Sequence, residues 1–277
     1  EQKPTDDKDS NYGIHTLPNL ETKFVAANSL IGLHSRRQVA VTGKKLSKKE
    51  REAAVPLLLV NEVEKLKADL WGVRHRHFNA RTRGEKKILR DEDKRLRKAL
   101  ALTLQETSVF DVKDAEQMAK WDPYDQNLSS SFFDAEWMFN VKDGFDVVIG
   151  NPPYGFRNIL SPEEKKYFRK VEGIDFPTGD IAELFILKSL SQFVANAGML
   201  TFNKKKKSLY GESLSNVRRL WLENSLHFLM DASKAFDNVL LEQAAFAVRK
   251  GRPEERKVAV GYLNGDLQDV CALAQIS

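Results

Sequence analysis

One short stretch of the chain carries residue types that can do chemistry, Asn151-Pro152-Pro153-Tyr154. The asparagine amide offers two hydrogen-bond donors and two acceptor lone pairs. The prolines fix φ, donate no backbone hydrogen bond and hold each preceding residue extended, while Tyr154 presents a flat ring with a polar tip. Rigid acceptors beside an aromatic ring suit a planar base that bears an amino group. The alternative is that these residues form only a turn, because Asn-Pro and Pro-Pro are common in turns.

The residues before this stretch predict where it lies. Phe145 to Ile149 is a short apolar run rich in β-branched residues, the pattern of a central strand in a covered parallel sheet. Gly150 ends this strand. Ligands of open α/β sheets bind outside the carboxyl ends of the strands. The stretch at 151–154 is therefore interpreted as a binding site rather than as a plain turn.

The rest of the chain supplies the elements that would position this site. Ser161 and Pro162 predict a helix start. The alternation of strands and helices after residue 145 predicts an α/β fold with a doubly wound sheet and an antiparallel end. We expect three parts: a segment with one sheet strand at 1–33, an inserted helical hairpin at 34–110, and a half at 111–277 that carries the 151–154 stretch. Apolar periodicity and turn residues predict strands at 22–27, 198–202, 226–230, 244–248 and 258–263, and helices at 47–76, 85–104, 114–121, 180–195 and 211–222.

Three segments leave two interpretations open. The helical hairpin is highly charged, and its basic residues either contact a DNA backbone or form a solvated face among acidic neighbours. The aromatic segment 132–139 forms either a packed plug or a binding surface. The run Asn203-Lys204-Lys205-Lys206-Lys207 follows a predicted strand, where it either meets phosphate groups or forms a solvated loop.

The composition excludes several classes of protein. The 277 residues are 42% hydrophobic and 30% charged with a net charge of +5, which suits a globular chain and mildly favours an acidic partner such as nucleic acid. No apolar run is long enough to span a bilayer and the first residues are polar, so we expect neither a membrane protein nor a signal peptide. The single cysteine, Cys271, excludes an internal disulfide framework and a cysteine-based zinc site. It fits a reducing cytoplasm, and no metal site is expected.

The 151–154 stretch and its preceding strand resemble a motif shared by amino-methyltransferases. Over nearly the whole chain, the sequence resembles the γ-type adenine-N6 DNA methyltransferases, specifically the Eco57I-like type IIG restriction-modification enzymes. The stretches that carry this resemblance lie at 17–20, 24–32, 121–127 and 132–139. The resemblance implies a Rossmann-like class I methyltransferase sheet, S-adenosylmethionine as the methyl donor, double-stranded DNA as the partner and a cytoplasmic location.

The resemblance also implies roles for the catalytic residues. Asn151 and the carbonyl of Pro152 would accept hydrogen bonds from the adenine N6 amine, and Pro153 belongs to the same catalytic motif. Tyr154 would stack on the target base once that base is flipped out of the duplex. Phe236 lies in a segment that resembles a second family motif and would pack against the same base.

The cofactor would be bound by residues on two segments. Asn28 would contact its adenosine, and Asp180, Ile181 and Phe185 would line its adenine pocket, although Phe185 suits a plain core position equally well. The glycine-rich cofactor loop of the family should precede the Asn28 segment, and nothing before residue 22 supplies it. We therefore expect an incomplete cofactor site, little or no activity in these residues alone, and a longer parent that adds a target-recognition domain and a cofactor-binding half.

The leading interpretation is part of a site-specific DNA methyltransferase that acts on adenine N6 within a restriction-modification system. Two alternatives stay open. One is a methyltransferase for the amino groups of protein glutamine or RNA guanine, whose members share the Asn-Pro-Pro-Tyr motif, although the aromatic loop and the hairpin speak against it. The other is a non-catalytic DNA-binding or docking module that keeps only the fold.

Overall fold

The computed structural model describes residues 17–33, 57–106, 112–153, 160–170, 172–174, 180–233, 242–252, 258–263 and 270–276. The chain divides into two compact units, Glu1–Asn140 and Val141–Ser277. Each unit has a hydrophobic core of its own. The division into three parts at residues 33 and 110 stays a prediction.

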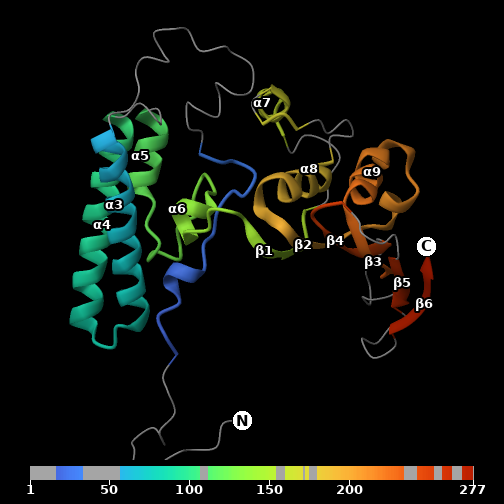
Figure 1. Ribbon diagram of the computed structural model, residues 1–277, viewed down its shortest axis with the longest axis horizontal. Coiled ribbons are helices and arrows are strands. Elements are labelled where there is room, and N and C mark those ends of the chain that lie inside the picture. Colours follow the sequence, from blue (N-terminus) through green and yellow to red (C-terminus); the bar gives the residue numbers. More distant parts are fainter. Residues whose placement is uncertain are drawn as a thin grey trace, which may run out of the picture. The chain divides into compact units, whose positions relative to one another are not determined.

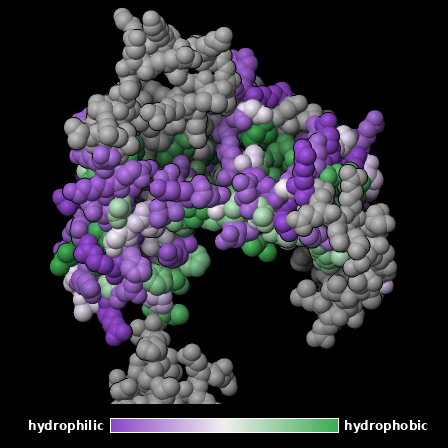
Figure 2. Space-filling view, in the orientation of Figure 1, coloured by the Kyte–Doolittle hydropathy of each residue, from purple (hydrophilic) through white to green (hydrophobic). Residues whose placement is uncertain are grey.

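The first unit is built on an antiparallel helical pair, as the sequence predicts (Figure 1). Helix α3 spans Leu57–Asn79 and helix α4 spans Arg83–Glu106, with α5 at Val112–Lys120 packed beside α4. The expected start of the first helix at residue 47 and the kink at Pro56 lie outside the described residues. Hydrophilic side chains predominate on the visible face of the pair (Figure 2).

The aromatic segment 132–139 forms part of the core of this unit. Phe132, Trp137 and Met138 are buried among leucines of the two long helices. Helix α6, Ala135–Phe139, begins at Asp134, whose carboxylate accepts a hydrogen bond from the backbone N–H of Trp137. The interpretation of this segment as a packed plug is therefore confirmed.

The expected strand at 22–27 is wrong. Residues Glu21–Lys23 form a short 3₁₀ helix, η1, and only Ala27 makes a β-bridge, parallel to Ser130. The backbone groups around it pair with a loop, since Asn28 N–H donates to the Ser130 carbonyl and Ser130 N–H donates to the Ala26 carbonyl. Because the backbone N–H and C=O groups of this segment pair with a single loop residue, no continuous ladder of strand hydrogen bonds forms.

The second unit contains a six-stranded mixed sheet in the order β1-β2-β4-β3-β5-β6 (Figure 1). Strands β1 and β2 are parallel, as are β3 and β5, whereas β4 is antiparallel to both of its neighbours and β6 to β5. The mixed α/β class and the antiparallel end are confirmed, and β6 adds a strand that the sequence pattern did not predict. The strands span Phe145–Gly150, Val194–Lys205, Ser225–Asp231, Gln243–Arg249, Val258–Leu263 and Val270–Ile276 for β1 to β6.

Helices α8, Ile181–Lys188, and α9, Ser215–Glu223, lie on the same side of this sheet (Figure 1). Their apolar residues, together with the π-turn η2 at Ser189–Phe193, pack on Leu200, Phe202 and Phe246. The helix expected at 180–195 therefore ends early, because the strand β2 already begins at Val194. Two 3₁₀ turns, η3 at Lys206–Leu209 and η4 at Glu212–Leu214, precede α9.

Strand β1 is not the covered central strand that its sequence predicts. It lies at one edge of the described sheet, and the side chains of Val147 and Ile149 are 61% and 78% exposed. A continuous apolar run predicts burial on both faces, but here only the face toward α8 is packed. The prediction is therefore wrong for the described part of the chain.

Helix α7, Pro162–Lys170, begins as the sequence predicts. The Ser161 hydroxyl accepts a hydrogen bond from the backbone N–H of Glu164 at 3.1 Å, and the Glu164 carboxylate accepts one from the Ser161 N–H at 2.7 Å. This reciprocal pair is a capping box. Among the described helices, none is both long and apolar enough to cross a membrane.

Candidate active site

The Asn-Pro-Pro turn lies directly after β1. The register of the parallel pair places Gly150 opposite Phe202 of β2, so that Asn151 is the first residue beyond the paired strand. Asn151 and Pro153 are exposed, and Pro152 is buried. An exposed amide on a turn anchored by a buried proline can present its oxygen to a ligand from a fixed position.

Two residues are expected to stack on the target base beside this turn. Tyr154 and Phe236 both lie outside the described residues. Their stacking roles therefore stay predictions.

The start of helix α8 lies at the same edge of the sheet as Asn151. In a β-helix-β crossover the helix runs back against the strands, so that its N-terminus returns to the carboxyl ends of the strands. Asp180 is 1% exposed and caps the helix, since its Oδ1 accepts a hydrogen bond from the Ala182 N–H at 3.0 Å. Ile181 is buried beside it. The structure thus brings Asn151, Asp180 and Ile181 to one edge, while their contacts with a cofactor stay predictions.

Phe185 occupies a different environment from its predicted neighbours. It lies in the second turn of α8 and packs against the core cluster that contains Ile186 and Phe202. These contacts are those of a core residue. A core position was the alternative that the sequence left open for Phe185. Its role in a cofactor pocket stays a prediction.

The carboxyl edge of the sheet also gathers charges that the sequence pattern did not assign. Lys204 lies within β2 and is 1% exposed, so this part of the lysine run is neither a solvated loop nor a phosphate-facing surface. Lys206 forms an ion pair with Asp231 at the end of β3, with Nζ and Oδ2 2.8 Å apart. The hydrogen bond to Asp231 raises the pKa of Lys206. Strict alternation along β2 was the signal that could have separated the inward Lys204 from its neighbours.

Asn28 belongs to the first compact unit. Its side chain is committed to its own backbone, because Oδ1 accepts a hydrogen bond from the Leu30 N–H at 3.1 Å. The residue is nevertheless exposed. Its contact with a cofactor stays a prediction.

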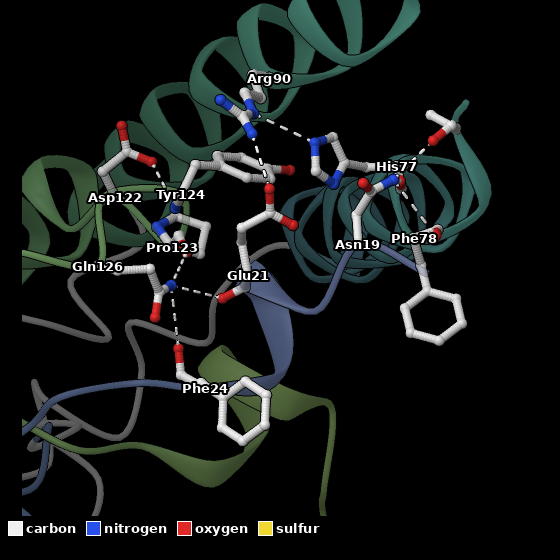
Figure 3. Close-up of polar contacts among 11 residues, drawn as sticks. Asn19, Glu21, Phe24, His77, Phe78, Arg90, Asp122, Pro123, Tyr124 and Gln126 are labelled. Carbon is white, nitrogen blue, oxygen red and sulfur yellow. Dashed lines mark hydrogen bonds and ion pairs between the residues drawn. The ribbon is translucent and has the colours of Figure 1, made fainter. Parts of the chain in front are cut away.

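The segment that carries Asn28 is held by side-chain amides (Figure 3). Asn19 Nδ2 donates to the carbonyl oxygens of His77 and Ala80, each at 2.7 Å, and so satisfies acceptors at the C-terminal end of α3. Gln126 Nε2, from the loop after α5, donates to the carbonyl oxygens of Glu21 at 2.9 Å and Phe24 at 3.3 Å. The loop at 121–127, which carries part of the family resemblance, therefore fixes the N-terminal segment.

A charged group connects the same segment to the helical pair (Figure 3). Arg90 donates to the Glu21 carboxylate at 2.9 Å and to His77 Nε2 at 3.2 Å, and its guanidinium lies 5.2 Å from the centre of the Tyr124 ring. Burial lowers the pKa of His77, which fits its role as an acceptor of the Arg90 hydrogen bond. Burial also raises the pKa of Tyr124 above its ordinary value.

Part of the charge on the helical hairpin points inward. Asp93 is 0% exposed and accepts hydrogen bonds from Arg74 Nε at 2.9 Å and Arg97 Nε at 2.5 Å. The two arginines also donate to the backbone carbonyls of Trp137 and Trp121. Both interpretations of the hairpin assumed outward-facing charges, and for Arg74 and Arg97 both are wrong. These arginines link the hairpin to the aromatic segment instead.

A comparison with known protein families shows to which family the chain belongs. The model of the family described as Eco57I restriction-modification methylase matches residues 26–236, which is more than half of the chain. The chain belongs to this family. The matched range includes the Asn151 turn, the start of α8 and the aromatic loop of this Eco57I-family chain. The expected class I methyltransferase fold is therefore confirmed by the family and by the mixed α/β sheet.

One relative of this Eco57I-family chain is a protein of Methanocaldococcus jannaschii, provisionally named type II restriction enzyme and methyltransferase RM.MjaORFECS2P. The two are 36% identical over 134 residues, which is 47% of this chain and 10% of the relative. The chain thus spans about a tenth of the length of this curated relative.

Solved structures show weaker likenesses. The type IIL restriction-modification enzyme MmeI, in complex with DNA, is 10% identical with a TM-score of 0.37, over 88% of this chain and 43% of MmeI. The M protein of the type I restriction enzyme EcoKI is 14% identical with a TM-score of 0.37, over 62% of this chain and 41% of that protein. Scores of this size add nothing to the family assignment.

Proposed function

We propose that this chain is part of a DNA methyltransferase that transfers a methyl group from S-adenosylmethionine to the N6 amine of adenine within a restriction-modification system. The observation that carries the proposal is the position of Asn151. In a chain of the Eco57I family, this exposed amide and the following prolines stand at the carboxyl end of β1. That edge is where open α/β sheets bind their ligands.

Methyl transfer requires that the N6 amine of adenine be held in place with its nitrogen lone pair directed at the methyl group. The N–H groups of adenine N6 donate to Asn151 Oδ1 and to the carbonyl oxygen of Pro152. Because the prolines fix the turn, these acceptors do not need to reorganise during the reaction. In the transfer, the nitrogen lone pair would form the new N–C bond as the C–S bond of the donor breaks, and the electron pair of that bond would stay on the sulfur of the leaving thioether. The extra proton on N6 leaves to water.

S-adenosylmethionine, when bound, supplies the electrophilic methyl group. Of the described residues, Asp180 and Ile181 fit a position beside it, because both stand at the edge that holds Asn151. Phe185 is proposed at the base of the adenine pocket, through its packing on the core below the edge. Asn28 is proposed as a contact of the adenosine, as the resemblance implies.

The partner in this proposal is double-stranded DNA in the cytoplasm. The target adenine has to leave the helix, because an enzyme cannot reach its target atom while the base is stacked inside the duplex. Tyr154 and Phe236 are proposed to stack on the extruded base. A target-recognition domain and a further cofactor-binding segment are proposed in the full-length parent.

The substitution Asn151→Ala in the full-length parent tests this proposal. Transfer of a radiolabelled methyl group to adenine-containing duplex DNA is expected to fall about 100- to 1,000-fold, the loss typical of removing one preorganised hydrogen-bonding group. DNA affinity at fixed salt is expected to stay within about twofold, since the side chain contacts the reacting amine and no phosphate. Asn196→Ala is the matched control, because Asn196 is an exposed asparagine near the amino end of β2, at the opposite end of the strands from Asn151.

The same assay separates the other candidate functions. Methylation that persists in Asn151→Ala would support a docking or DNA-binding module in place of a catalytic one. Methyl transfer to protein glutamine or to RNA guanine, with DNA failing to compete, would replace the DNA substrate by another amino group.

A further inference from the structure

Lys204 lies on the buried face of β2, which otherwise carries apolar side chains at the preceding positions. Leu200, Phe202 and Lys204 follow one another on the same face of the strand, at 0%, 5% and 1% exposure. Leu200 and Phe202 belong to the core beneath α8 and α9. The lysine therefore continues a buried apolar row at the end of the strand that neighbours β1.

The Lys204 ammonium is poorly compensated. Among the described residues, its Nζ has no hydrogen-bond partner and makes no ion pair within direct contact distance. Burial lowers its pKa to about 8, and Asp180 and Glu183 only partly oppose that shift. Lys188, a second buried lysine of this unit, differs because its Nζ lies 3.0 Å from the Glu172 carboxylate. A buried charge without a close partner among the described residues costs stability.

The topology places this lysine at the same end of the strands as the proposed active site. In the parallel register of β1 and β2, Phe202 stands opposite Gly150, so Lys204 is level with Pro152, one residue beyond Asn151. The start of α8, with Asp180 and the fully buried Glu183, returns to the same edge. Lys204, Asp180 and Glu183 are all buried, and the register places Lys204 level with the Asn-Pro-Pro turn along the strands.

We infer that Lys204 is a positioning residue of the methyl-transfer site, whose buried ammonium attracts Asp180 and Glu183 without direct contact and thereby favours the position of the N-terminus of α8 where the methyl donor binds. This inference rests on the proposed function. It explains why a destabilising residue is present, because functional sites commonly reduce the stability of the fold that carries them. The lysine acts through α8 and touches no reacting atom.

The test uses the full-length parent with Lys204→Met, which keeps the length of the side chain and removes its charge. The dissociation constant of S-adenosylmethionine, measured by calorimetry without DNA, is expected to rise about tenfold, the range typical when a supporting residue around a ligand site is lost. The melting temperature is expected to stay about equal, because removal of a buried ammonium offsets the loss of its attraction to Asp180 and Glu183. In methylation assays the KM for the donor should rise more than kcat falls.

Two further variants supply the controls. Lys205→Met changes the adjacent, half-buried lysine, whose side chain points to the other face of β2, and should leave donor affinity unchanged. Lys204→Arg keeps the positive charge and should recover part of the lost affinity.

Each contrary outcome overturns the inference in a recognisable way. Donor affinity that is unchanged in Lys204→Met would show that the lysine positions nothing. A fall in melting temperature that accounts for the lost affinity would make Lys204 an ordinary structural charge. The proposed function fails separately: a wild-type parent that binds S-adenosylmethionine but methylates no DNA would refute that function while the affinity measurement still tests Lys204. A wild-type parent that does not bind the donor would refute both.

Discussion

Gly150 and Phe202 face each other across the β1–β2 pair, one residue before Asn151. A Cβ atom at Gly150 would lie 3.2 Å from Cε1 of the Phe202 ring. This contact is tighter than ordinary van der Waals packing, so the position of the Asn-Pro-Pro turn depends on the absence of a side chain at residue 150.

The substitution Gly150→Ala is expected to displace the turn. The Phe202 ring is itself buried in the core and can move only slightly, so the strand end must shift. We expect a loss of about 1–2 kcal/mol in the free energy of unfolding. Methyl transfer by the full-length parent should fall by about tenfold or more, since small misplacements of reacting groups are costly. Gly72→Ala, at an exposed helical position where an added Cβ meets nothing within 4 Å, is the control.

The buried carboxylate of Asp93 supports a second prediction. Asp93→Ala removes the counter-charge of both Arg74 and Arg97 and is expected to lower the free energy of unfolding by about 3–5 kcal/mol. Glu92→Gln, which breaks the surface pair with Arg76, should change it by about 0.5 kcal/mol or less. Denaturant titration of both variants makes the comparison. Equal effects would mean that the Asp93 network does not support the helical pair.

His77 predicts a loss of stability in acid. Its folded pKa lies below 6.5, mainly because of burial, with Arg90 and Lys86 lowering it further and Glu21 and Asp93 opposing. The unfolded chain therefore binds a proton first, and stability falls as the pH drops below about 6.5 toward the folded pKa. The slope of unfolding free energy against pH in that range should flatten in His77→Gln. His75→Gln, on the exposed face of the same helix, should keep the wild-type slope.

The lowered pKa of Lys204 predicts a change of stability on the alkaline side of neutral pH. Its folded pKa of about 8 lies below the ordinary value of 10.5, so the unfolded state binds more protons between these values. The free energy of unfolding therefore rises from about pH 8 to about pH 10.5, by at most about 3.5 kcal/mol at about 1.4 kcal/mol per pKa unit. The difference in unfolding free energy between wild type and Lys204→Met should shift in favour of the wild type across that range. A difference that does not vary with pH would place the ammonium in water.

The sequence by itself determined the elements that depend on local patterns. Helical periodicity predicted α4 and α5, Ser161 and Pro162 predicted the start of α7, and apolar runs predicted strands β1 to β5 of the sheet. The Asn151 turn was found because its rigidity and hydrogen-bonding groups are properties of adjacent residues. These features arise from neighbours within one helical turn or one strand, where the physical signal is contained in the sequence.

Only the tertiary structure decided which neighbours those elements meet. A strand at 22–27 required a partner strand, but the partner is a loop at Ser130. An apolar β1 implied cover on both faces, but one face is exposed in the described sheet. The lysine run was predicted to follow a strand, whereas β2 continues through Lys204 and turns it inward, and the hairpin gave no sign that Asp93 binds two arginines. Burial and charge pairing depend on residues far apart in the chain, so the sequence pattern alone could not determine them.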